Sequence, residues 1–218
     1  MTLAALDRRA APHALAVFGA LHPDPFDCDD TLPAGTGTVV LFGPREPGFW
    51  AHFTAQPEFS DGAADPMDRW SKRVLGKIAA QVAGTAIFPS DGPPYPAFTE
   101  WARRSGRAWP SPVGLLVHDS AGLFLSYRGA IAVAETLDLP PHAANPCRNC
   151  ADTPCVTACP VGALTADTYD VRRCKTYLET PPGQDCMTHG CGTRRACPVS
   201  ARCGRVSAQS AFHMEHFK

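Results

Sequence analysis

The first two-thirds of the chain alternate short apolar runs with polar connections rich in proline and glycine, a pattern typical of a sheet with flanking helices. The apolar runs predict strands over residues 14–20, 38–42 and 85–88. Residues 23–37, which contain Pro, Asp and Gly, are predicted to form the loop between the first two strands.

One long helix is predicted over residues 66–82, with Pro66 in its first turn and Asp65 as its cap. The apolar side chains that follow helical spacing are Met67, Trp70, Val74, Leu75, Ile78 and Val82. Shorter helices are predicted over residues 98–104 and near the end of the chain, over 209–218.

The clearest hairpin signal joins residues 113–119 to residues 123–133 through the turn Ser120-Ala121-Gly122. After it, Leu139–Pro146 has three prolines in eight residues, which predicts a stiff connection. We therefore expect two domains, residues 1–142 and residues 143–218, the first of them an α/β domain with a small sheet.

The second domain has few long apolar runs, so its core is small and bound metal would help to hold it together. Nine of the ten cysteines lie in it, and eight of these fall between Cys147 and Cys197. The run Cys147-x2-Cys150-x4-Cys155-x3-Cys159-Pro160 is close to the pattern that binds a [4Fe-4S] cluster, although its second gap is wider than usual. Four more thiols follow, at Cys174, Cys186, Cys191 and Cys197-Pro198.

Eight thiolates are what two [4Fe-4S] clusters require, because each of the four irons of a cluster takes one thiolate. In two-cluster ferredoxins the cysteine that precedes proline binds the other cluster. Applying this rule gives one set of Cys147, Cys150, Cys155 and Cys197, and a second set of Cys159, Cys174, Cys186 and Cys191. The expected fold is thus α+β: the N-terminal domain, followed by a ferredoxin-like two-cluster domain.

Zinc is the main competing interpretation, since two C-x2-C-like pairs suit a tetrahedral ion. Zinc sites, however, usually show two tight pairs and not a four-cysteine run that ends in Cys-Pro. Unligated thiols and disulfides are further alternatives. Two cysteines remain outside the two sets: Cys28, between acidic neighbours in a predicted loop, and Cys203, which is an alternative ligand for the second set.

The bulk properties limit the possible partners. The formal net charge is −1, which gives no strong basic field for nucleic acid. No apolar run approaches the roughly 18 to 20 residues that span a membrane, and residues 1–9 lack the order of a secretion signal. We expect a cytoplasmic protein, where thiols stay reduced and clustered cysteines favour metal. Its partner would be a redox protein or a small-molecule acceptor.

Three segments carry a family resemblance: Cys-Pro-Val-Gly-Ala-Leu at 159–164, the segment 169–178, and 190–198 with its Ala-Cys-Pro end. They resemble the ferredoxin-type half of epoxyqueuosine reductase, a group related to the reductive dehalogenases. Residues 107–119 and 122–131 are similar to the hairpin before the clusters in those enzymes. The resemblance covers about half of the chain, residues 100–200.

The resemblance implies a cobalamin between the two domains, with the clusters passing electrons to cobalt. Two departures limit it: Ser111-Pro112 replaces a Gly-Lys pair, and the spacing of Cys186, Cys191 and Cys197 differs from the family's second run. The first hypothesis is therefore an electron-transfer protein with two [4Fe-4S] clusters. The alternatives are a cobalamin-dependent reductase, which would make the chain an oxidoreductase, and a zinc-stapled structural module.

Overall fold

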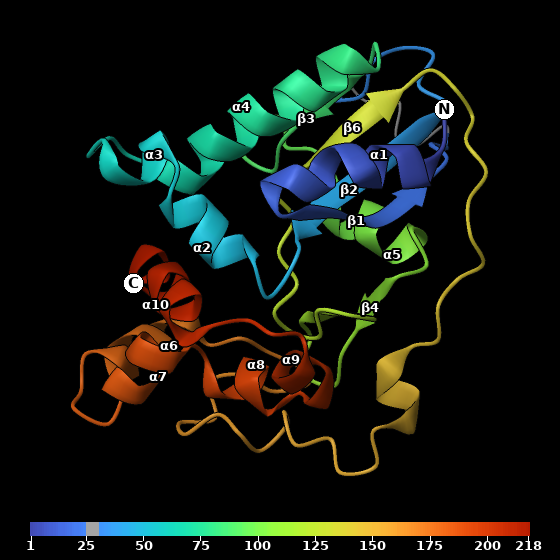
Figure 1. The fold of residues 1–218 in the computed structure, drawn as a ribbon. Helices are drawn as coiled ribbons and strands as arrows, with labels where there is room; N and C mark the ends of the chain where they lie inside the picture. The colour runs from blue at the N-terminus through green and yellow to red at the C-terminus, as the bar shows by residue number, and fades with distance from the viewer. Residues whose placement is uncertain (25–30) are drawn as a thin grey trace. The chain divides into compact units, whose positions relative to one another are not determined.

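The computed structural model describes residues 1–24 and 31–218 and has a mixed α+β fold (Figure 1). Its contacts divide the chain into two units. The sheet unit comprises residues 1–107 and 126–142, and the cysteine unit comprises residues 108–125 and 143–218. The division at 142/143 coincides with the predicted boundary, whereas the segment 108–125 belongs with the cysteines.

The sheet unit contains a four-stranded antiparallel sheet in the order β1-β2-β6-β3. Its strands are β1 (Leu15–Leu21), β2 (Thr38–Pro44), β3 (Thr85–Ile87) and β6 (Gly129–Val133). Its helices are α1 (Leu3–Ala10), η1 (Ala11–His13), α2 (Phe49–Thr54), α3 (Pro57–Ser60), α4 (Pro66–Gln81) and α5 (Phe98–Arg104). Every pairing in this sheet is antiparallel, and the predicted α+β class with a small N-terminal sheet is confirmed.

Both faces of this sheet are covered, so its central strands β2 and β6 are buried along their whole length. Phe98 and Trp101 of α5 pack against Val39, Leu41 and neighbouring residues of one face. The long helix α4 packs on β3 and β6. It approaches β6 closely at Gly129, where a Cβ atom would lie 2.7 Å from Leu75 Cδ1.

The predicted strands and the long helix of this unit are present, with ends that lie within two residues of the predicted ones. The predicted cap is wrong in its chemistry. Asp65 does precede α4, but it has a left-handed backbone with φ of 50° and its side chain makes no capping hydrogen bond.

The predicted hairpin of 113–119 with 123–133 is also wrong. The turn itself forms, because His118 and Gly122 exchange backbone hydrogen bonds of 3.0 Å. Beyond it the chain does not return along the first strand: β5 (Leu116–His118) pairs with β4 (Ala108–Pro110), and β6 pairs with β2 and β3. The small apolar residues of β6 suit a strand buried on both faces better than a hairpin arm.

The cysteine unit is built from short helices around the β4–β5 ribbon. These are η3 (Pro146–Asn149), α6 (Val171–Leu178), α7 (Gln184–His189), α8 (Gly192–Ala196), α9 (Pro198–Arg202) and α10 (Ser207–Phe217). The last of these includes the predicted C-terminal helix and packs on α7, and the Phe217 ring stacks on Tyr169 with centroids 6.1 Å apart.

Candidate metal centre

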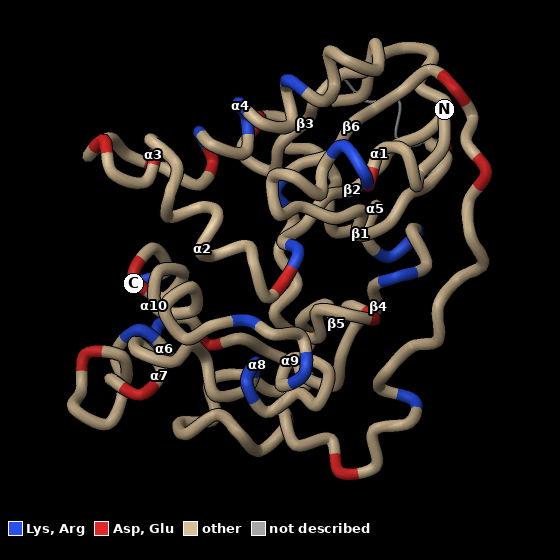
Figure 2. Tube along the Cα trace, in the orientation of Figure 1, with Lys and Arg blue, Asp and Glu red and all other residues tan. Residues whose placement is uncertain are grey.

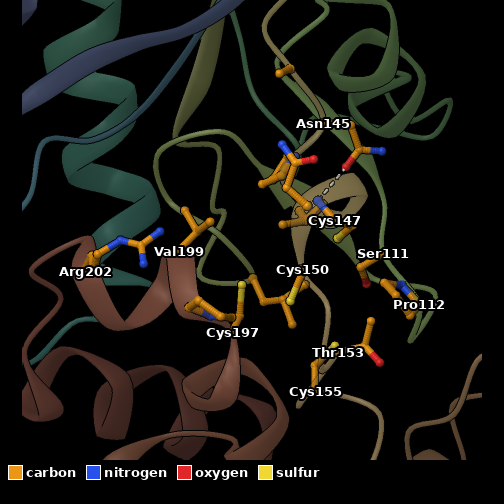
Figure 3. A pocket seen from close by; sticks show the side chains of 16 residues that line it. Ser111, Pro112, Asn145, Cys147, Cys150, Thr153, Cys155, Cys197, Val199 and Arg202 are labelled. Carbon is orange, nitrogen blue, oxygen red and sulfur yellow. Dashed lines mark hydrogen bonds between the residues drawn. The ribbon is translucent and has the colours of Figure 1, made fainter.

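Four cysteines line one cavity of about 340 Å³ in the cysteine unit (Figure 3). They are Cys147, Cys150, Cys155 and Cys197, the members of the first predicted set. Cys147 lies in η3, Cys150 directly follows it, and Cys155 lies in the next turn. Cys197 comes from a distant part of the sequence, immediately before α9. The structure thus brings together the three closely spaced cysteines and the distant Cys-Pro cysteine around one cavity.

Local sequence explains how two of these thiols are held. The Asn145 side chain accepts a hydrogen bond of 2.9 Å from the Cys147 backbone N–H and so caps η3. Cys197 is extended, with φ of −65° and ψ of 124°, which is the conformation that a following proline favours. Pro198 then begins α9, where its missing N–H costs no helical hydrogen bond.

Apolar residues form the wall behind the first set. Val113, Val117, Leu123 and Leu164 are buried with Cys155 and Cys197 in one cluster, which Cys159 and Cys191 also border. The Ser200 hydroxyl accepts a hydrogen bond of 2.8 Å from the Leu123 N–H. This bond fixes α9, and therefore Cys197, to the segment that follows β5.

The other four thiols lie on the loop after the first motif and on three short helices. Cys159 is in that loop, Cys174 in α6 and Cys186 in α7, and Cys191 immediately precedes α8. Hydrogen bonds reach two of the sulfurs: the Ala163 N–H donates to Cys159 Sγ over 3.2 Å, and the Tyr169 hydroxyl donates to Cys174 Sγ over 3.8 Å.

The electrostatic neighbours of these thiols divide them into the same two sets. Burial raises the pKa of Cys147, and the other three thiols of the first set raise it further. Burial also raises the pKa of Cys174; the Tyr169 hydrogen bond opposes this, and the other three thiols of the second set add to it. Two separate groups of four thiols therefore exist in the cysteine unit. Their raised pKa favours the protonated form of Cys147 and Cys174, so a metal that binds these two thiols must displace protons.

Basic residues surround the two groups, as Figure 2 shows by the blue segments on α6, α8 and α9. Arg202 lines the cavity of the first set. Arg195 forms an ion pair with Asp185 and donates to the Gly190 carbonyl over 2.9 Å. Arg194 donates to the Leu123 carbonyl over 2.6 Å. Arg194 and Arg195 are thus used in structural bonds, and Arg202 borders the first thiol group.

Among the described residues, no group of three or more His, Cys, Asp or Glu side chains is arranged to hold a metal ion. A single zinc ion would require its sulfurs about 2.3 Å from one point. The four thiolates of a cubane bind four different irons and so lie farther apart. The fit of such a cluster is therefore judged from the all-thiol donor sets, the cavity at the first set, and the hydrogen bonds to sulfur at the second.

Two buried polar side chains in the cysteine unit add to this fit. Thr193 and Gln209 are fully buried, and neither side chain has a hydrogen-bond partner in the described part of the chain. Thr193 is two residues from Cys191, and Gln209 lies on α10, which packs on the helix that holds Cys186. Unsatisfied buried groups of this kind are typical beside a bound group or ordered water.

Two cysteines, Cys203 and Cys28, lie outside the two predicted sets. Cys203 is half-buried at the end of α9. It is absent from the lining of the first cavity and from the thiols that act on Cys174 or Cys186. Cys28 lies outside the described residues. Sequence reasoning missed the roles of Asn145 and Tyr169, although Asn before Pro-Cys is an ordinary signal for a cap.

Comparisons of the chain with protein-family models, with curated proteins and with solved structures found no match. The similarity to epoxyqueuosine reductase therefore rests on the motif residues alone. Within residues 1–24 and 31–218, no helix has the length and apolar character needed to cross a membrane.

Proposed function

We propose that this chain is an iron–sulfur electron-transfer protein that carries two [4Fe-4S] clusters. Cys147, Cys150, Cys155 and Cys197 would hold one cluster, and Cys159, Cys174, Cys186 and Cys191 the other. The observation that carries the proposal is that the eight thiols form two separate groups of four, each completed by a Cys-Pro cysteine from the other half of the motif. When bound, such clusters accept and release single electrons.

The residues of the chain supply the rest of what this function requires. The crossing of Cys159 and Cys197 between the two groups ties both halves of the unit together, so that metal binding also stabilises the fold. Cys159 and Cys191 of the second group border the apolar cluster that contains Cys155 and Cys197 of the first. Two neighbouring clusters would allow an electron to pass from one to the other within the unit.

The acceptor in this proposal is a redox partner protein or a small molecule. The cytoplasm, where thiols stay reduced, is the compartment that suits assembly of such clusters. The likeness to epoxyqueuosine reductase makes a cobalamin-dependent reductase the enzymatic alternative, but no described residue has been assigned to a corrin.

The test is metal analysis of the full chain purified without oxygen. We expect about eight iron and eight sulfide per chain, and an electron paramagnetic resonance signal on reduction. Cys155→Ser and Cys186→Ser should each lose about half of the iron, because they remove ligands of different clusters.

Cys203→Ser is the matched control, because Cys203 lies outside both proposed ligand sets and the variant should keep all of the iron. Zinc in place of iron would contradict the proposal. A loss of iron in Cys203→Ser equal to that in Cys186→Ser would contradict the ligand assignment.

A further inference from the structure

A second cavity, of about 330 Å³, lies within the sheet unit, and no cysteine is among its lining residues. It is lined by Asp68, Ser71, Phe88, Pro89, Ser90, Tyr127 and Arg128. The register of the sheet explains why these segments meet. Because Ile87 of β3 pairs with Ala130 of the antiparallel β6, the residues after β3 lie beside the residues before β6. The first turns of α4 form the remaining wall.

Arg128 is held rigidly at this site. Its backbone N–H donates to the Phe42 carbonyl over 2.8 Å, and its Nη2 donates to the Ser126 hydroxyl over 2.7 Å. Only 14% of its side chain is exposed. Among the described residues Arg128 forms an ion pair with Asp68, whose Oδ1 lies 4.0 Å from Nη1, too far for a hydrogen bond.

The positive charge of Arg128 is therefore poorly compensated. Its buried Nε has no hydrogen-bond partner within the described part of the chain. Asp68 is 53% exposed and faces water as well as the guanidinium, which weakens its attraction. Burial lowers the pKa of Arg128, and Asp68 opposes this only as a second contribution. A buried cation without a close anion is costly, and an anion in the cavity would remove that cost.

The other walls indicate what the rest of the ligand would be. Phe88 is 8% exposed and, with Pro89 and the Tyr127 ring, makes one side of the cavity apolar. Ser71 uses its hydroxyl proton on the Met67 carbonyl, 2.7 Å away, and so has lone pairs left to accept. A small molecule with an apolar body and one anionic end matches this lining.

The number of charges decides between a carboxylate and a phosphate. A dianionic phosphate would call for a second cation, and the nearby Lys72 is paired with Asp91 at 3.0 Å. A dianion would also meet the carboxylate of Asp68 beside Arg128. A carboxylate carries one charge and matches the planar guanidinium in two parallel hydrogen bonds.

We propose that this cavity binds a small organic monocarboxylate with an apolar body, through the terminal nitrogens of Arg128. The apolar body would lie against Phe88 and Tyr127. The site is independent of the proposed clusters, so its test can succeed or fail whatever metal the cysteine unit holds.

Benzoate is a suitable probe, benzamide is its neutral counterpart and inorganic phosphate is the alternative anion. Each is titrated into the full chain by calorimetry at constant ionic strength. We expect saturable binding of benzoate, at least tenfold tighter than that of benzamide or phosphate. Arg128→Gln should weaken benzoate binding at least tenfold. Asp68→Asn should tighten it severalfold, because it removes the competing carboxylate.

Equal affinities for benzoate and benzamide would overturn the proposal, and so would an Arg128→Gln chain that folds and still binds benzoate normally. Tighter binding of phosphate than of benzoate would overturn the choice of a carboxylate. If Arg128→Gln does not fold, the comparison of benzoate with benzamide and the Asp68→Asn titration still test whether the cavity binds a carboxylate.

Discussion

The Tyr169 hydroxyl donates a hydrogen bond to the Sγ of Cys174, over 3.8 Å, from a position five residues earlier in the chain. Burial raises the pKa of Tyr169, and Cys174 raises it further, so the hydroxyl stays protonated and remains a donor. The ring is fixed from the other side by Phe217 of α10, whose plane lies within 11° of it. Tyr169 therefore contributes a fixed dipole that points at one sulfur of the second thiol group.

Replacement of this tyrosine should change a reduction potential. A hydrogen bond to a ligand sulfur favours the reduced cluster, which carries more negative charge, and so raises its potential. Tyr169→Phe keeps the ring and removes the donor. A hydrogen bond worth about 0.5–1.5 kcal/mol corresponds to a fall of about 20–60 mV for a one-electron couple. Redox titration followed by electron paramagnetic resonance measures it.

Tyr177→Phe is the matched control for this change. Tyr177 is a tyrosine of the same unit, but its hydroxyl donates to the Pro182 carbonyl over 3.1 Å and not to a thiol. Its replacement should leave both potentials within a few millivolts of the wild type. Equal shifts in the two variants would show that the effect is not due to the Tyr169–Cys174 bond.

If the cysteine unit holds the proposed clusters, removal of their iron should unfold this unit and spare the sheet unit. The cysteine unit has small apolar clusters of which its own thiols are members, whereas the sheet unit buries large side chains such as Trp70 and Trp101 between sheet and helices. Metal that binds the folded unit stabilises it by its binding free energy, and a chelator withdraws that stabilisation. Hydrogen exchange after anaerobic chelation should show lost protection in α6–α9 and unchanged protection in β2 and β6. Loss of protection in β2 and β6 as well would contradict this division.

The sequence predicts the two proposed ligand sets because ligand spacing is a local property, and the assignment of these ligands stays a prediction. Three cysteines within nine residues must lie close together, and the proline after Cys159 and Cys197 marks the ligand that is shared across the motif. What spacing could not give is the environment of each sulfur. The donor for Cys174 depends on where Tyr169 is packed, and that is fixed by Phe217, more than forty residues later.

The strands were also predictable, because short apolar runs identify them, but their partners were not. Residues 129–133 are apolar in any pairing, and local sequence favoured the nearest strand, residues 113–119. Pairing with β2 instead depends on burial on both faces, which is a property of the whole sheet. Arg128 similarly has no motif: its importance follows from the register that brings it beside Phe88.

The sheet unit should lose stability as the pH falls through the neutral range. His13 and His52 lie with ring centroids 6.1 Å apart, and burial is the main cause that lowers the pKa of each. Arg73 lowers both further by its charge, and for His13 the charge of His52 contributes as well. Below the ordinary histidine pKa of about 6.5 the unfolded chain therefore binds more protons than the folded chain. The free energy of unfolding then decreases as the pH is lowered.

The measurement is urea unfolding followed by tryptophan fluorescence between about pH 7.5 and 5.5. His13→Gln should flatten this dependence, because it removes one of the two groups that titrate. His216→Gln, which alters an exposed histidine in the other unit, should leave it unchanged. A wild-type stability that stays constant over this range would refute the explanation.

Glu58 should make the stability of the sheet unit depend on pH in a second, more acidic range. Its carboxylate is 10% exposed and accepts two hydrogen bonds from Arg73, at Nε and, over 2.9 Å, at Nη2. These bonds hold the pKa of Glu58 below its ordinary value. The stabilisation is thus complete above the ordinary glutamate pKa of about 4.3, and it is lost as the pH falls through the lower value in the folded chain.

Glu58→Gln should cost about 1.5 kcal/mol of unfolding free energy at pH 7, because it weakens charge-assisted hydrogen bonds to a largely buried carboxylate. The difference from wild type should shrink below about pH 4, where the wild-type carboxyl becomes protonated as well. Asp61→Asn is the comparison, since Asp61 pairs with Arg69 at the surface, where ion pairs contribute little. A Glu58→Gln difference that is the same at about pH 3 and at pH 7 would show that the ionised pair is not its source.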